Sequence, residues 1–161
     1  MFVDGRFEAA LSTLDGLPKG VTVESLAALI ARDPAVAEAE LATRDDSLPL
    51  VALNTAFVAD GLVLRLARGA VLDKPLHLIS VGATPTVFHP RHLIRLEPDA
   101  VATVVESHVG SQAEVGGYFA TAWSISRSAP GRPCGTHIAE SGRGGVPCRR
   151  GAAEARRARD L

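Results

Sequence analysis

The sequence predicts a mixed fold in which an N-terminal helical region leads into stacked coils of short β-strands. Three observations predict it. Apolar residues recur with a helical period over about the first sixty residues, they alternate with period two from Leu62 onward, and short motifs then recur 30 residues apart. With 161 residues, 47% of them hydrophobic, the chain is long enough to bury a core.

Three helices are expected within residues 1–60. The first begins near Val23 with Thr22 as its N-cap, because apolar residues then recur at i, i+3, i+4 and i+7. The second follows directly, with Asp33 as N-cap and Pro34 at the first helical position. A third short helix covers about 50–57 and stops at the Asp-Gly turn signal that follows it.

Short strands separated by equally short turns are expected after residue 61. They cover 62–66, 70–72, 75–81, 92–96, 101–109 and 118–122. Leu64-Arg65-Leu66 recurs as Ile94-Arg95-Leu96, and Ala70-Val71 recurs as Ala100-Val101, at the same offset of 30 residues. Such a repeat favours stacked coils that bury their inward residues against one another, and two similar hairpins of a β-sandwich are the alternative.

Several stretches together resemble a known family. "LNTAFVADGLVLRLARGAVLDKPLHLI" (53–79), "HPRHLIRLEPDAVATVVESHVG" (89–110) and the start, "FVDGRF" followed by "LDGLPKGVTVESLAALI", are similar to the SufD component of the SufBCD iron–sulfur cluster assembly machinery. The similarity covers roughly residues 2–122. The start of the chain is less like the paralogue SufB.

The resemblance implies a right-handed parallel β-helix with a helical region before it. Residues 1–60 are then the N-terminal helical region, 61–124 the start of the β-helix core, and 125–161 a disordered tail. It also implies a scaffold, not an enzyme, that pairs with SufB and recruits the SufC ATPase. The side chains that the family uses for assembly lie further along the β-helix, so no catalytic, cofactor-binding or metal residue is assigned. The intact complex, and not this chain, is expected to hold the iron–sulfur cluster.

The chain is expected to be cytoplasmic, with neither a membrane nor a nucleic acid as partner. It has no apolar run of 18 residues, and its start lacks the order of regions found in a signal peptide. It also lacks a Gly-rich phosphate loop of Walker type, so any ATP dependence is expected to come from a partner.

The tail differs in charge and composition from the rest. Residues 127–161 hold eight basic and three acidic residues, against nine and fifteen in residues 1–126, and they are rich in Arg, Gly, Ala and Pro. Such a segment buries too little apolar surface to offset its ordering entropy. Because the resemblance stops near Trp123 and these amino acids have GC-rich codons, we expect a frameshift near 120–126 and a truncated product that is inactive in cluster assembly. The exposed end of its last coil predicts marginal solubility or self-association.

The alternatives for the tail are an ordinary disordered terminus, a zinc site, a disulfide and a nucleic-acid arm. Cys134, His137 and Cys148 give three ligands, whereas a structural zinc site uses four. A disulfide between the two cysteines conflicts with a reducing cytosol. A nucleic-acid arm would want aromatic residues between its arginines, and there are none.

Outside the tail, a few histidines and one glutamate could belong to a functional site, but each also has an ordinary structural explanation. The pair His89 and His92, and the pair Glu106 and His108, have spacings that suit a metal or acid–base chemistry, but turn or surface histidines and an amphipathic strand explain them as well. His77 is expected to be a satisfied sheet residue.

Arg65 and Arg95 are equivalent in the repeat and should stack on the outer face of adjacent coils. Their like charges favour exposure or an acidic neighbour. The rival function is a small β-helical carbohydrate- or acyl-transfer enzyme, but a hexapeptide period and a stacked acid cluster are both missing. Ser107 precedes a histidine without the surrounding motif of a serine hydrolase.

Overall fold

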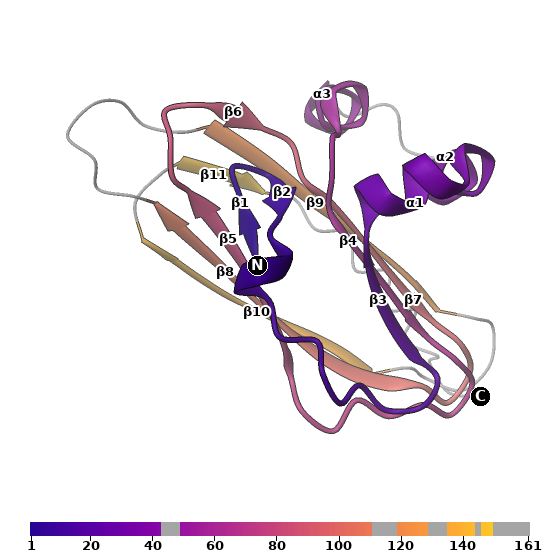
Figure 1. The fold of residues 1–161 in the computed structure, drawn as a ribbon. Helices are drawn as coiled ribbons and strands as arrows, with labels where there is room; N and C mark the ends of the chain where they lie inside the picture. The colour runs from indigo at the N-terminus through magenta and orange to yellow at the C-terminus, as the bar shows by residue number, and fades with distance from the viewer. Residues whose placement is uncertain (43–48, 111–118, 129–134, 144–145, 150–161) are drawn as a thin grey trace, which may run out of the picture.

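The computed structural model describes residues 1–42, 49–110, 119–128, 135–143 and 146–149, with side chains as far as residue 110. It is a mixed α/β structure with two mixed sheets that face each other and three α-helices (Figure 1). The strand orders are β10-β8-β5-β1-β2 in one sheet and β11-β9-β7-β4-β3 in the other, with the short β6 (Val87–Phe88) on β9 (Phe119–Ser128).

Residues 1–60 contain the helices and three short strands. The elements are β1 (Phe2–Val3), β2 (Arg6–Phe7), the 3-10 helix η1 (Ala9–Leu11), β3 (Val21–Ser25), α1 (Leu26–Arg32), α2 (Pro34–Leu41) and α3 (Pro49–Phe57). The predicted second and third helices are confirmed. Asp33 caps α2 by accepting from the Val36 N–H at 3.1 Å, with Pro34 at the first position.

The predicted start of the first helix is wrong. Residues Val21–Ser25 form β3, which pairs antiparallel with β4 (Leu62–Leu66), and the N-cap is Ser25, whose Oγ accepts from the Ala28 N–H at 3.0 Å, not Thr22. The edge of β4 offers main-chain partners to this segment, and the pairing overrides its local helical pattern.

The repeat of 30 residues is the register of the sheet. Arg65 pairs with Arg95 in parallel between β4 and β7 (Arg91–Leu96), and Val71 forms an isolated parallel bridge to Val101, where the short strand at 70–72 was expected. In the other sheet, β5 (Leu76–Gly82) pairs in parallel with β8 (Val101–Gly110). Neighbouring hairpins would pair antiparallel, so the hairpin alternative is wrong for these strands.

Two strands lie inside residues 125–161, for which the sequence predicts no regular structure. β10 (Gly135–Arg143) pairs with β8, and β11 (Val146–Arg149) pairs with β9. This pairing uses main-chain groups, so the low apolar content of the segment does not prevent it. Residue 134 and the side chains of residues 137 and 148 lie outside the described part of the structure, and so do the zinc and disulfide alternatives.

The larger hydrophobic core lies between the two sheets. β4 contributes Leu62, Leu64 and Leu66 to it, β7 contributes Ile94 and Leu96, and Ala102 and Val104 come from β8. A second cluster lies under α1 and α2 on the opposite face of β4 and β7, and it consists of Leu26, Leu29, Ala37, Val63 and Leu93. β4 is therefore buried on both faces, as parallel strands with covered faces are. Among the described residues, no helix has the length and apolar character needed to cross a bilayer.

Asp60 joins the helical region to the strands. Its side chain, 4% exposed, accepts three main-chain hydrogen bonds, from the N–H groups of Phe7 (2.8 Å), Ala27 (3.0 Å) and Gly61 (2.7 Å). The Asp60 carbonyl accepts from the Arg91 N–H at 3.1 Å, and the Gly61 carbonyl accepts from the Leu26 N–H at 2.7 Å. The dipeptide Asp60-Gly61 thus connects the β1–β2 hairpin, the start of α1, and the strands β4 and β7.

Gly61 has no room for a side chain. A Cβ added there would lie 1.7 Å from the Arg91 carbonyl oxygen. We expect Gly61→Ala to lower the free energy of unfolding by at least about 3 kcal/mol, because main chain rather than a flexible side chain must move. Gly16→Ala is the control in urea denaturation. Gly16 has φ +76° but no atom within 4 Å of an added Cβ, so only the backbone penalty of about 1 kcal/mol applies. Equal losses for the two variants would contradict the close packing.

Candidate functional site

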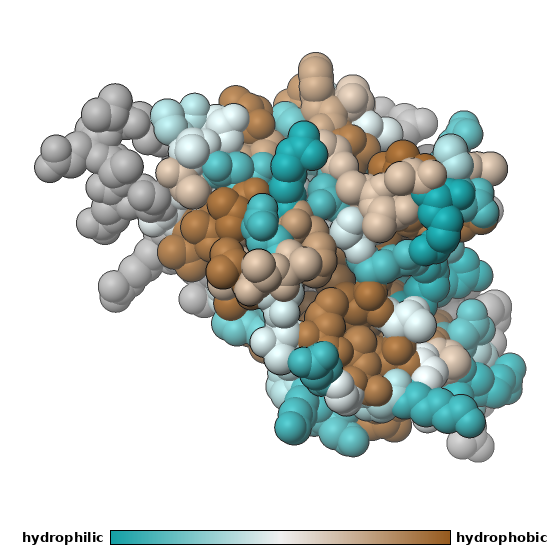
Figure 2. All heavy atoms as spheres, viewed as in Figure 1, coloured by the Kyte–Doolittle hydropathy of each residue, from teal (hydrophilic) through white to brown (hydrophobic). Residues whose placement is uncertain are grey.

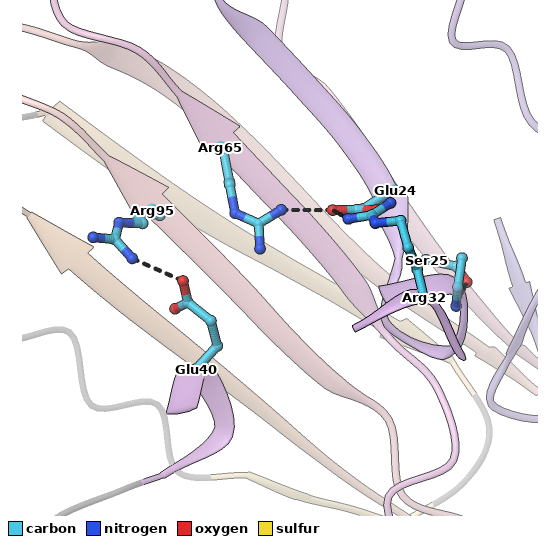
Figure 3. Close-up of polar contacts among 7 residues, drawn as sticks. Glu24, Ser25, Arg32, Glu40, Arg65 and Arg95 are labelled. Carbon is cyan, nitrogen blue, oxygen red and sulfur yellow. Dashed lines mark hydrogen bonds and ion pairs between the residues drawn. The ribbon is translucent and has the colours of Figure 1, made fainter. Parts of the chain in front are cut away.

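The outer face of the second sheet carries a row of arginines. Arg65 and Arg95 occupy paired register positions on β4 and β7, and the main chain of Arg127 on β9 takes the next position. Arg65 Nη1 lies 2.5 Å from Glu24 Oε1, and Arg95 Nη1 lies 2.7 Å from Glu40 Oε1 (Figure 3). Of the two alternatives, exposure or an acidic neighbour, both arginines have the acidic neighbour, and Arg95 is also half exposed. Glu24 lies on β3 of the same sheet, whereas Glu40 lies on α2, so the Arg95 pair joins a helix to the sheet and the Arg65 pair links two of its strands.

Glu24 is shared between two arginines. Arg32 donates two hydrogen bonds to its carboxylate, at 2.7 and 3.2 Å, and Arg65 donates a third (Figure 3). The hydrogen bonds from Arg32 lower the pKa of the Glu24 carboxyl, burial opposes them, and Arg65 lowers the pKa further. The carboxylate is therefore ionised throughout the neutral range.

A polar cluster lies inside, between the sheets, where β7 and β8 face each other. Glu106 Oε1 lies 3.2 Å from His108 Nε2 and 3.9 Å from His92 Nε2, and both His92 and Glu106 are fully buried. His92 Nδ1 accepts from the Leu62 N–H at 3.0 Å, which places the proton of a neutral ring on Nε2, toward Glu106. The ring of Phe2 packs edge-on against His92, with centroids 5.5 Å apart.

Two expectations for these residues are wrong. His92 was expected in a turn or on the surface, and Glu106 with His108 on the polar face of an amphipathic strand. β7 begins at Arg91, so its inner face carries His92 ahead of Ile94 and Leu96. Glu106 and His108 do share one face of β8, but that face points inward. In the ranges that have side chains, no three His, Cys, Asp or Glu residues are placed to hold a metal ion.

His77 was expected to be a satisfied sheet residue, and this is confirmed. Its Nε2 lies 2.9 Å from the Ser107 hydroxyl across the β5–β8 pair. No acidic side chain among the described residues is hydrogen-bonded to this imidazole to orient it. The contact is a cross-strand hydrogen bond on an outer face, not a nucleophile with its base.

A hollow of about 660 Å³ opens between the β1–β2 hairpin, α3 and the segment around β6. We call it the hairpin hollow. It is lined by Asp4, Gly5, Arg6, Leu53, Phe57, Ala59, Thr84, Thr86, Val87, Phe88 and His89. The rings of Phe57 and His89 lie 5.7 Å apart, and burial lowers the pKa of His89, so this imidazole is uncharged at neutral pH. His89 was expected in a turn or on the surface. It lies in the connection between β6 and β7, but it is largely buried beside the hollow.

Comparisons with known proteins find a similarity for the helical region and the first strands of the sheets. Residues 1–78 match the family model described as the SufBD protein N-terminal region. The chain is also 30% identical over 112 residues to an iron–sulfur cluster assembly SufBD family protein of Synechocystis sp., an alignment that covers 67% of this chain and 25% of the relative. No solved structure matches the chain significantly. The first 78 residues are thus similar to the N-terminal region of SufBD proteins, and the chain spans about a quarter of the length of this relative.

Sequence reasoning missed Asp60 as more than a turn residue. The available signal was an acidic residue before glycine at the junction of the helical and β regions, but only the structure shows its three amide donors. It also missed the hairpin hollow, whose lining comes from three separate stretches of sequence.

Glu24→Gln tests the arginine row through its pH dependence. Because folding lowers the pKa of Glu24, its stabilisation is complete above the unfolded value of about 4.3 and fades as the pH falls through the folded value. We expect the variant to lose up to about 1 kcal/mol at pH 7 and less below pH 4. The check is urea denaturation across this pH range with Glu38→Gln, on the exposed side of α2, as control. A constant difference at all pH values would contradict the ion pair.

Glu106→Ala tests the interior cluster. Removing this carboxylate leaves two imidazoles facing a buried void, so we expect a loss of about 3 kcal/mol or more in the free energy of unfolding. Glu97→Ala is the control. Glu97 forms a partly exposed ion pair with Arg95, so its removal should lower the free energy of unfolding by less than about 1 kcal/mol. Chemical denaturation monitored by circular dichroism measures both, and a similar small loss for both would show that the cluster contributes nothing.

Proposed function

We propose that this chain is the N-terminal part of a SufD-type scaffold for iron–sulfur cluster assembly. The match of residues 1–78 to the SufBD N-terminal region carries the proposal. The similarity to the Synechocystis SufBD family protein extends the support over 112 residues. In this proposal the chain is cytoplasmic, is not itself an enzyme, and belongs to a protein that pairs with SufB and recruits the SufC ATPase.

The proposal includes a right-handed parallel β-helix that begins after residue 61. The chain alternates between the two sheets, and strands about 30 residues apart pair in parallel, β4 with β7 and β5 with β8. An apolar interior between the sheets fits stacked coils. In this arrangement the helical region covers the first coil, because β3 pairs with the edge of β4 and β1 pairs with the edge of β5.

The arrangement favours binding over chemistry. The polar groups that meet on the outer face are engaged in ion pairs, Glu24 of β3 with Arg65 of β4 and Glu40 of α2 with Arg95 of β7. Their geometry links neighbouring elements, and among the side chains that the structure describes on that face no nucleophile lies beside an acid–base pair.

A domain exchange tests the function and separates SufD from SufB. Residues 1–110 of this chain replace the corresponding region of SufD in a cell whose own SufD is deleted, and of SufB in a parallel strain. We expect the SufD chimera to restore cluster-dependent enzyme activity and to copurify with SufB and SufC, and the SufB chimera to do neither. If both chimeras accumulate and neither restores activity, the SufD assignment is wrong.

A further inference from the structure

The hairpin hollow has an apolar rim that the fold itself does not use. Phe57 is 63% exposed and Val87 is 60% exposed, more than any other large hydrophobic residue in the described part of the chain. Both lie in regular elements, α3 and β6, on opposite sides of the hollow. Apolar side chains reach the surface over these two elements in Figure 2. Exposed apolar residues concentrated around a concavity mark an interaction site.

The wall formed by the hairpin is held in place from two directions. Gly5, at φ +78°, packs so closely that an added Cβ would lie 2.8 Å from Phe88 Cβ. Asp4 accepts hydrogen bonds from the Ala83 N–H (2.8 Å), the Thr84 N–H (3.3 Å) and the Thr84 hydroxyl (2.8 Å). Burial raises the pKa of the Asp4 carboxyl, but these hydrogen bonds outweigh burial, so the pKa is lowered and the carboxylate stays ionised. The hollow is therefore formed before any ligand enters it.

Arg6 supplies a positive charge to the lining. Its exposed guanidinium makes no ion pair with a described residue, whereas Arg32, Arg65 and Arg95 each contact a glutamate. The Asp4 carboxylate is already engaged with three donors, and His89 is uncharged. A ligand in the hollow thus meets aromatic and aliphatic surface together with one cation.

We propose that the hairpin hollow binds a short segment of a partner protein in which a large apolar side chain stands next to a carboxylate. The apolar side chain lies between Phe57 and Val87, and the carboxylate pairs with Arg6. A peptide fits better than a small metabolite, because Leu50, seven residues before Phe57 on the same face of α3 and 45% exposed, continues the apolar rim beyond the hollow. This inference is independent of a role in cluster assembly.

The test uses the full chain and a defined probe, the fluorescein-labelled peptide Gly-Leu-Phe-Glu-Gly-amide, followed by fluorescence polarisation at low ionic strength. We expect saturable binding with a dissociation constant below about 1 mM. Phe57→Ser should weaken it about tenfold, as should alanine in place of the peptide phenylalanine. Arg6→Gln and glutamine in place of the peptide glutamate should each weaken it about two- to fivefold. When the Arg6→Gln variant is tested with the glutamine peptide, binding should be no weaker than with either change alone, because both changes remove the same ion pair.

Two variants on other surfaces serve as controls. Val36→Ser on α2, where Val36 is 41% exposed, and Arg68→Gln in an exposed turn should leave binding unchanged. Val87→Thr keeps the β-branched shape of β6 and gives a second variant if Phe57→Ser does not fold.

Absence of saturable binding, or binding that is insensitive to both Phe57→Ser and Val87→Thr, would overturn the proposal. Analytical ultracentrifugation measures whether the chain forms a dimer. A dimer of the chain that Phe57→Ser dissociates would show that a second copy occupies the hollow, and the proposed peptide does not.

Discussion

The buried carboxylate of Asp60 is the constraint on which the arrangement of the two regions depends. A carboxylate in a position 4% exposed to solvent is stable only when hydrogen bonds replace its hydration. Its donors are the main-chain amides of Phe7, Ala27 and Gly61, which belong to a hairpin, a helix start and the entry to β4. None of these segments can shift without leaving the charge unsatisfied, so Asp60 fixes the position of the helical region on the strands.

That position determines what each face of the sheets contacts. β4 sends Leu64 into the space between the sheets and Val63 toward α1 and α2, so one strand supports both hydrophobic clusters. On the same outer face, Arg65 meets Glu24 and brings a charged contact beside the apolar one. The hairpin that Asp60 holds through Phe7 also forms one wall of the hairpin hollow. Attachment of the helical region and the shape of the hairpin hollow therefore have one structural origin.

Much of this follows from the sequence, and the exceptions have identifiable causes. The cap at Asp33 and the parallel register of Arg65 with Arg95 were predictable, because capping and repetition are local or periodic signals. The strand at Val21–Ser25 was not, because its partner lies some forty residues away and overrides a helical pattern. The burial of Glu106 was not predictable either. Along β8 the apolar Val101 and Val109 occupy the exposed face, whereas Glu106 lies on the buried face, so the alternation of residue types does not identify the inner face.

Amide hydrogen exchange tests the central claim most directly, namely that Asp60 makes the helical region and the parallel strands one cooperative unit. The amides of Phe7 and Ala27 should exchange with the same opening free energy as that of Ile94 in the core. In Asp60→Asn, the opening free energies of all three should fall together. Exchange of Phe7 and Ala27 through a smaller opening that leaves Ile94 protected in the native protein would show that the helical region unfolds separately, and would contradict this account.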